Sequence, residues 1–311
     1  MPTIRPAVPA DAAAVVTLRE KVFPYLVRGV TATNRTIASP PPGEDWAAFV
    51  ALDRDRIVGW VAASRNPRAA NPDAGAISLL HVHPDHRRRG IGTALYQAAT
   101  GHLRSVGVRR VSTISRPDSL EFARRHGFEP VREVRYSALD LSAERSSAER
   151  SSAERSSGAE QAGVRLIPLA EVDEQALYRA DGEAATDEPG DQPSAPAPYE
   201  TWRYEIWDNA DLDRRSSTLA VDGDGRVLAF TLLLRDGTRL WSDMTATVPE
   251  FRGMGLAGLI KRTALERAAS AGATVAYTAN DEANRPMLAV NERLGYRALT
   301  TNIGCVTILA D

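Results

Sequence analysis

Apolar and polar residues alternate with a period of two in matching segments of the two halves of the chain, and this alternation predicts strands. In each half, two such segments flank an Asp-rich turn and predict a hairpin, and a third strand follows it. The hairpins span residues 46–64 and 217–234, and the third strands span 76–84 and 239–249. A helical period follows at residues 90–106 and 255–271, and each predicted helix stops at a glycine, Gly107 or Gly272, as a C-terminal cap would.

Both halves then continue in the same order, with a short strand, a helix ending in His-Gly-Phe or Leu-Gly-Tyr, and a last strand at 133–141 or 302–309. Pro249 follows Pro84 by 165 residues, and Gly295 follows Gly127 by 168. The chain is therefore predicted to hold two tandem copies of one αβ (α+β) unit. We expect each to be a mixed, mostly antiparallel sheet flanked by helices, with the two sheets side by side in a pseudo-twofold arrangement.

A repeated pentapeptide separates the two halves. The sequence AERSS occurs at 143–147, 148–152 and 153–157 and has almost nothing apolar to bury. It predicts a linker, flexible or transiently helical. We therefore expect domains at 1–141 and 164–311 with the linker at 142–163. A Pro-, Gly- and acid-rich stretch at 186–198 predicts a long loop inside the second domain.

Composition narrows the class of protein. The chain has 311 residues, 43% apolar residues and a formal net charge of −2, which gives no electrostatic support to a general nucleic-acid or membrane-surface role. Cys305 is the only cysteine, so neither an intramolecular disulfide nor a zinc cluster of cysteines is expected, and no metal site is predicted. The first residues show no long apolar core, so no leader or membrane-spanning segment is expected. We expect a cytoplasmic protein without a membrane or nucleic-acid partner, either a monomer that forms an internal pseudo-dimer or a homodimer.

The turn between the third strand and the helix indicates an anion site in both halves. A glycine-rich turn that opens a helix directs backbone N–H groups and a positive dipole end outward, and neighbouring arginines add charge. A tight turn with solvated arginines is the alternative for one isolated copy, but two copies with equivalent flanks favour a phosphate or pyrophosphate. The turns comprise Arg87, Arg88, Arg89, Gly90, Ile91, Gly92 and Thr93, and Arg252, Gly253, Met254, Gly255, Leu256, Ala257 and Gly258.

These turns, VHPDHRRRGIG and TVPEFRGMGLA, resemble the acetyl-CoA motif of the GNAT acyltransferase superfamily, and the resemblance covers nearly all of both halves outside the linker. It implies two fused GNAT domains, with acetyl-CoA (CoA) as the cofactor and its pyrophosphate on the turns. The preceding strand, Leu80–Val82 or Thr245–Thr247, is then expected to pair its backbone with the pantetheine arm. The resemblance also implies cofactor contact for Asn284, at the leading asparagine of the last-helix motif, with Asn280 at the end of the preceding strand. Plain turn and N-cap chemistry is the alternative for both asparagines.

Proton transfer in acetylation of an amine requires a base and a proton donor for the leaving thiolate. The family often uses a tyrosine of the last helix as the donor, but Asn291 and Ala123 stand at that position here. Asparagine can donate a hydrogen bond but cannot give up a proton at neutral pH, so water or another group must replace the tyrosine.

Three residues are candidate bases. Asp243 and His81 lie on the strands before the turns, and His81, whose side chain should face away from Leu80 and Val82, is expected to titrate near neutral pH. Glu282 follows a strand in the second half, where a solvated first-turn acid is the alternative. The aromatics of residues 199–209 fall at helical spacing and predict a core-facing helix that could also wall the acceptor site.

The sequence thus predicts an acetyl-CoA-dependent N-acetyltransferase that acts on a primary amine of a small molecule or peptide. The second half is the expected catalyst because its asparagines match the family pattern better. In the alternative, one or both domains are non-catalytic acetyl-CoA-binding or regulatory modules. Transfer of a longer acyl chain also stays open.

Overall fold

The computed structural model describes residues 3–69, 71–142, 163–184 and 196–310. Its strands form one continuous twelve-stranded sheet in the order β1-β2-β3-β4-β5-β12-β6-β11-β10-β9-β8-β7. The order is the same from either edge if each first-half strand is exchanged for its second-half counterpart, which is the expected pseudo-twofold arrangement. The repeated linker and most of the predicted loop at 186–198 lie outside the described residues.

Each half is a mixed, mostly antiparallel sheet flanked by helices, as predicted. The first half has strands β1 Thr3–Pro6, β2 Ala47–Asp53, β3 Arg56–Arg65, β4 Ala74–Val82, β5 Arg110–Ser115 and β6 Glu129–Asp140, and helices α1 Ala12–Val22, α2 Val30–Ala38, α3 Ile91–Ser105 and α4 Leu120–Arg125. The second half has strands β7 Arg165–Pro168, β8 Thr218–Val221, β9 Val227–Asp236, β10 Arg239–Thr247, β11 Val275–Asp281 and β12 Arg297–Ile308, and helices α6 Glu174–Ala184, α7 Tyr199–Trp202, α8 Leu256–Ser270 and α9 Arg285–Arg293.

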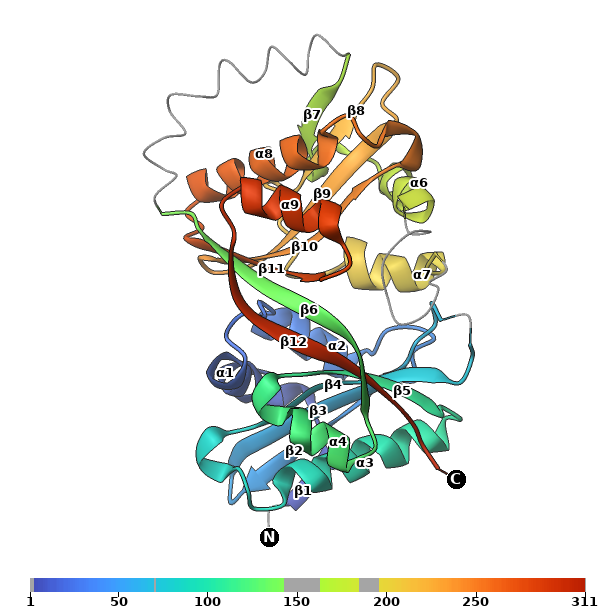
Figure 1. Ribbon diagram of the computed structural model, residues 1–311, viewed down its shortest axis with the longest axis vertical. Coiled ribbons are helices and arrows are strands. Elements are labelled where there is room, and N and C mark those ends of the chain that lie inside the picture. Colours follow the sequence, from blue (N-terminus) through green and yellow to red (C-terminus); the bar gives the residue numbers. More distant parts are fainter. Residues whose placement is uncertain (1–2, 70, 143–162, 185–195, 311) are drawn as a thin grey trace.

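The two halves exchange their last strands. The final strand of the first half, β6, pairs antiparallel with β11 of the second half, and the final strand of the chain, β12, pairs antiparallel with β5 of the first. The exchanged strands also pair with each other, and Figure 1 shows them crossing between the two halves. The two sheets expected side by side are thus joined edge to edge, because each half lends the other its sixth strand.

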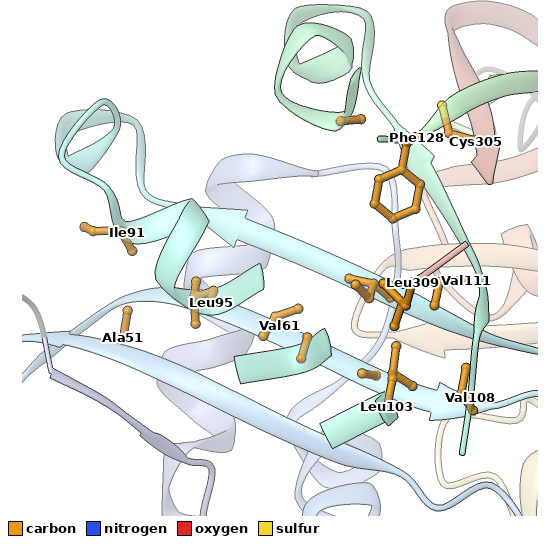
Figure 2. Packing of buried hydrophobic residues seen from close by; sticks show 14 of the residues in the cluster. Ala51, Val61, Ile91, Leu95, Leu103, Val108, Val111, Phe128, Cys305 and Leu309 are labelled. Atoms are coloured by element: carbon orange, nitrogen blue, oxygen red, sulfur yellow. The ribbon is translucent and has the colours of Figure 1, made fainter. Parts of the chain in front are cut away.

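The exchange carries residues of the C-terminus into the core of the first half. Helix α3 buries Ile91, Leu95 and Leu103 against the sheet, at the spacing of four residues that places side chains on one face. Cys305 and Leu309 of the chain's end belong to the same cluster, and Figure 2 shows Cys305 beside Phe128 and Leu309 near Leu103 and Val111. Burial of apolar surface, about 25 cal/mol per Å², therefore couples the two halves as well as stabilising each one.

The strands that carry the site part from their neighbours midway. Strand β4 pairs in parallel with β5 only from Ala74 to Ala76, and β10 pairs in parallel with β11 only from Arg239 to Trp241. Both β4 and β10 run at least six residues farther, so each half has a gap between these two strands that opens toward the glycine turn. The pairing of each of these strands with its outer neighbour has a register shift opposite this gap, between Trp60 and Ala62 of β3 in the first half and between Ser242 and Met244 of β10 in the second.

Candidate functional site

The two glycine turns have the same backbone geometry. Arg88 and Gly90 have φ of 60° and 78°, and Gly253 and Gly255 at the equivalent positions have 83° and 76°. Left-handed residues separated by one other residue turn successive N–H groups toward one side, the arrangement that binds anions. Glycine allows this backbone without strain at three of the four positions.

Each turn ends in a helix whose first N–H groups have no acceptor within the helix. The intrahelical hydrogen bonds begin with Ala94 N donating to Gly90 O and Leu259 N donating to Gly255 O. The N–H groups of Ile91, Gly92 and Thr93, and of Leu256, Ala257 and Gly258, precede these bonds. Arg87–Gly90 and Arg252–Gly255 are exposed, and a Cβ atom placed on Gly90 or Gly255 would meet nothing within 4 Å. A pyrophosphate therefore fits the residues present at either turn.

The first arginine of each turn fastens the turn to the end of the strand. Arg87 Nε donates to Val82 O at 3.3 Å, and Arg252 Nε donates to Thr247 O at 3.2 Å. The corresponding bonds join the same positions in both halves, so these arginines hold the turn as well as adding positive charge to it.

The gap between the two parted strands is also built alike in both halves. Where the parallel pairing ends, Thr113 Oγ1 donates to Ile77 O at 2.8 Å and Thr278 Oγ1 donates to Ser242 O at 3.1 Å. Beyond this point, Thr245 bonds Thr231 through their hydroxyl groups at 2.8 Å. In the first half, Leu80 and Val82 pack on the α3 side of the sheet, while Leu79 packs on the α1 side.

His81 lies in a buried, positively charged environment. Its side chain is 7% exposed, on the face opposite Leu80 and Val82 as predicted, and its Nδ1 has no hydrogen-bond partner among the described residues. Burial, with smaller contributions from Arg19, Arg116 and Arg87, lowers the pKa of His81 to about 3. The expectation that His81 titrates near neutral pH is therefore wrong. The imidazole of His81 is therefore neutral at neutral pH and shielded from solvent.

An arginine spans the end of the first-half gap. Arg116 stands at the position where the second half has Asn284, and its Nη1 donates to Val22 O, the last residue of α1, at 2.6 Å. Asp118 lies 3.4 Å from Arg116 Nε and 3.8 Å from Arg87 Nη1. The end of β5 is thus tied to α1 on the side of the sheet where His81 lies.

Asp243 occupies a different environment. It is the extra residue of the β10 bulge between Ser242 and Met244, its side chain is exposed, and its Oδ1 accepts a hydrogen bond from Trp241 Nε1 at 3.0 Å. A bulge takes its extra residue out of the ladder and re-aims its side chain. The second half therefore presents a carboxylate to solvent on the strand where the first half buries a histidine.

Three asparagines of the second half lie at the end of β11, at the N-cap of α9 and on α9 itself. Asn291 is 3% exposed, and its Nδ2 donates to Asn280 Oδ1 at 2.7 Å. Asn284 caps α9, with its Oδ1 accepting from Met287 N at 3.2 Å. The N-cap interpretation of Asn284 is confirmed, and cofactor contact through its Nδ2 stays a prediction. The first-half counterpart of Asn291, Ala123, is buried and apolar.

Glu282 is held by the exchanged strand. Arg135 of β6 donates from Nε to Oε1 at 2.8 Å and from Nη2 to Oε2 at 2.7 Å, and its Nη1 donates to Glu292 at 3.0 Å. A bidentate arginine engages both oxygens of the carboxylate. This geometry favours a role in fixing the loop before α9. Sequence reasoning missed Arg135, since it lies 147 residues from Glu282 and in the other half.

Aromatic side chains connect two of the candidate bases, His81 and Asp243, across the junction of the halves. The ring centre of Phe23 lies 6.2 Å from that of His81 and 5.2 Å from that of Tyr136. The ring centre of Tyr136 lies 6.1 Å from that of Trp241, the hydrogen-bond donor to Asp243. His81 and Asp243 are thus at opposite ends of one aromatic row and do not form a common catalytic pair.

A second aromatic cluster lies on the α6 and α7 side of β10. Trp202 is completely buried, as the core interpretation of residues 199–209 expects, and the helix continues past it as a π-helical turn, Arg203–Trp207. Tyr199 and Trp207, which are half-buried, pack in the same cluster as Met244 and Ala246 of β10. These rings therefore lie on the sheet face opposite α8, beside the parted strand.

Comparisons with known proteins agree with this geometry. The sequence profile described as the acetyltransferase (GNAT) family matches residues 18–128 and 183–296. The chain is 28% identical over 271 residues to the mycothiol acetyltransferase of Nocardiopsis dassonvillei, which covers 82% of this chain and 79% of that protein. It is also 28% identical over 148 residues to the aminoglycoside N(6')-acetyltransferase type 1 of Stenotrophomonas maltophilia, covering 45% of this chain and 94% of that one.

Solved structures share the fold over the whole chain. A tandem GNAT protein from the clavulanic acid biosynthesis pathway has a TM-score of 0.70 at 20% identity, with all of both chains covered. A GCN5-related N-acetyltransferase from Sphaerobacter thermophilus has a TM-score of 0.69 at 18% identity, covering 99% of this chain and 95% of that one. Within the described ranges, no helix is long and apolar enough to cross a membrane.

Proposed function

Since the chain belongs to the acetyltransferase (GNAT) family and is an acyltransferase, we propose that it acetylates a primary amine and that its second half is the catalyst. The observation that carries the assignment is the contrast between the two parted strands. The second half exposes Asp243 at the bulge of β10, whereas the first half buries His81 and ties Arg116 across the end of its gap.

The second glycine turn is the proposed pyrophosphate site of acetyl-CoA, the acetyl donor of the family. When bound, acetyl-CoA supplies an activated acetyl group as a thioester. The N–H groups of Leu256, Ala257 and Gly258 and the charge of Arg252 are suited to its phosphates. Asn284 Oδ1 already accepts a hydrogen bond as the cap of α9, and its Nδ2 is the group that can donate to the cofactor.

Asp243 is the proposed base. The amine must lose a proton before its lone pair can attack, and a carboxylate exposed beside the parted strand can take that proton directly or through water. Trp241 fixes one carboxylate oxygen through its indole N–H, and this bond orients the other oxygen. The half-buried rings of Tyr199 and Trp207 lie on the same strand's α7 face and are proposed to wall the acceptor.

A small-molecule or peptide amine is the proposed acceptor. Two relatives are named for mycothiol and for aminoglycosides, and these names support a small molecule. The first half is proposed to be a non-catalytic unit that keeps its anion-binding turn and packs against the second half. The turn geometry that it shares with the second half supports binding of the same cofactor there.

The test is release of free thiol from acetyl-CoA in the presence of a panel of amines. Asp243→Asn is nearly isosteric and should lower kcat about 100-fold or more, the scale of lost general-base catalysis, with CoA affinity almost unchanged. His81→Gln is the matched variant in the first half and should keep turnover. Loss of turnover in His81→Gln with retention in Asp243→Asn would assign catalysis to the first half instead.

A further inference from the structure

Two arginines of the first half hold a loop of the second half. Arg132 and Arg135 lie on β6, the strand that the first half lends to the other sheet. Arg132 Nη1 donates to Asp281 Oδ2 at 3.2 Å, and Arg135 bonds the two oxygens of Glu282 at 2.8 and 2.7 Å. The backbone adds a further contact, because Glu282 N donates to Glu133 O at 2.9 Å. The loop between β11 and α9 is therefore fastened to the other half by both side chains and backbone.

Arg135 connects this loop to α9 as well. Its Nη1 donates to Glu292 of α9 at 3.0 Å, so one guanidinium group engages two carboxylates. Asn280 lies directly opposite Arg135 in the ladder of β11 and β6, and residues opposite each other share one face of a sheet. On that face Asn291 of α9 donates to Asn280. The side chains of Arg135 and Glu282 are only 24% and 21% exposed, and a bidentate pair of this kind has a defined geometry.

The loop that is held in this way places the proposed cofactor contact. Asn284 ends the loop as the N-cap of α9, and its backbone N donates to Asp281 O at 3.0 Å. The Asp281 side chain accepts from Ala283 N at 2.8 Å through one oxygen and from Arg132 through the other. The position of Asn284 Nδ2 thus follows from a loop whose two acidic residues are bonded to β6.

The first half is built differently at the same place. Asn280 follows Ser115 by 165 residues, and these residues end the corresponding strands. Asn284 follows Arg116 by 168 residues, so the second-half loop is three residues longer. The residue opposite Ser115 on its exchanged strand is Ile303, which packs against the apolar core of the first half. The longer loop and the arginine that holds it therefore occur together in the half that is the proposed catalyst.

We propose that Arg135 is a positioning residue for acyl transfer in the second half, where it fixes the loop and α9 so that Asn284 meets the pantetheine arm of acetyl-CoA. This inference rests on the proposed function of that half. A loop that is ordered before the cofactor arrives does not have to be ordered when the cofactor binds, and this strengthens binding. The first half then supplies part of the cofactor site of the second half in addition to packing against it.

The direct test is the KM for acetyl-CoA in Arg135→Met, which removes all three side-chain hydrogen bonds of the arginine. The KM should rise several-fold, as expected for loss of the Asn284 contact, with kcat nearly unchanged, because the lost interaction is present in the ground state too. Adding Arg135→Met to Asn284→Asp should raise the KM no further, since effects that act through one contact are not additive. Arg239→Met is the control, because Arg239 also joins the halves, through Glu20 at 2.9 Å, and should leave both constants unchanged.

Glu282→Met breaks the same ion pair from the loop side. It removes a negative charge where Arg135→Met removes a positive one, so simple attraction of the anionic cofactor would change the KM in opposite directions in the two variants. Positioning predicts a rise in both. The variant also tests Glu282 as the alternative base, for which kcat would fall about 100-fold. We expect kcat to stay nearly unchanged.

A wild-type KM in Arg135→Met would overturn the proposal, as would a further rise when it is combined with Asn284→Asp. A lowered KM or a 100-fold loss of kcat in Glu282→Met would also overturn it, and this variant decides by itself if Arg135→Met does not fold. Calorimetry of CoA binding in a Gly90→Glu background, where the first turn is blocked, separates the inference from the proposed function. Weaker binding in both variants, with no amine acetylated by the wild-type protein, would contradict the proposed function alone.

Discussion

At neutral pH the imidazole of His81 is uncharged, because burial and three arginines lower its pKa to about 3. The unfolded chain protonates the same group near pH 6.5. Between these values the unfolded state binds more protons than the folded state, so acid destabilises the protein through this residue. Below pH 6.5 the titration of His81 therefore lowers the free energy of unfolding by up to about 1.4 kcal/mol per pH unit.

Replacing His81 should therefore flatten the acid side of the stability profile. We expect His81→Gln to lose less free energy of unfolding than the wild-type protein between pH 6.5 and 4.5, when both are followed by urea denaturation. The difference between the two proteins isolates this residue from the carboxylates that also titrate in that range. Equal losses in the two proteins would show that His81 is not held neutral.

The start of helix α9 combines two roles in one side chain. Asn284 Oδ1 caps the helix, and its Nδ2 is the proposed cofactor contact. Asn284→Asp preserves the cap and removes the amide donor, whereas Asn284→Ala removes both, at a cost of about 1 kcal/mol of stability. We expect both variants to raise the KM for acetyl-CoA several-fold and only the alanine variant to lower the melting temperature. A wild-type KM in Asn284→Asp would restrict this residue to capping.

Sequence patterns predicted the elements around the turns because their determinants are local. Helices α3 and α8 begin directly after Gly90 and Gly255 and end before Gly107 and Gly272, close to the predicted bounds. The ion pair between Arg135 and Glu282 joins β6 of the first half to the loop after β11 of the second, and neither residue type nor spacing indicates such a partner. The buried state of His81 likewise depends on Phe23 and α1, which pack on it from elsewhere in the chain.

The exchange of β6 and β12 makes the whole molecule one structural unit. Either last strand has the alternation that suits the neighbouring strand of its own half, so the sequence leaves their pairing open. An equivalent backbone hydrogen bond follows each exchanged strand: Leu141 N donates to Thr274 O, and Leu309 N donates to Arg109 O. Each half thus lacks its sixth strand unless the other is present.

Separate halves should consequently be unstable alone. A fragment of residues 1–142 lacks β12 and β11, the partners that β5 and β6 have in the whole chain, and 163–311 has the reciprocal defect. We expect each fragment expressed singly to show no cooperative thermal unfolding and the two co-expressed fragments to purify as a 1:1 complex. A singly expressed fragment that unfolds cooperatively as a monomer would show that the exchange is dispensable.

The central claim is that acyl transfer takes place in the second half. The most direct measurement is the steady-state turnover of Gly255→Glu compared with Gly90→Glu. The two positions have the same left-handed backbone and open surroundings, so the strain of substitution is matched, and each glutamate places bulk and negative charge where a pyrophosphate would lie. We expect Gly255→Glu to abolish turnover and Gly90→Glu to retain most of it. Turnover that survives in Gly255→Glu and is lost in Gly90→Glu would contradict this account.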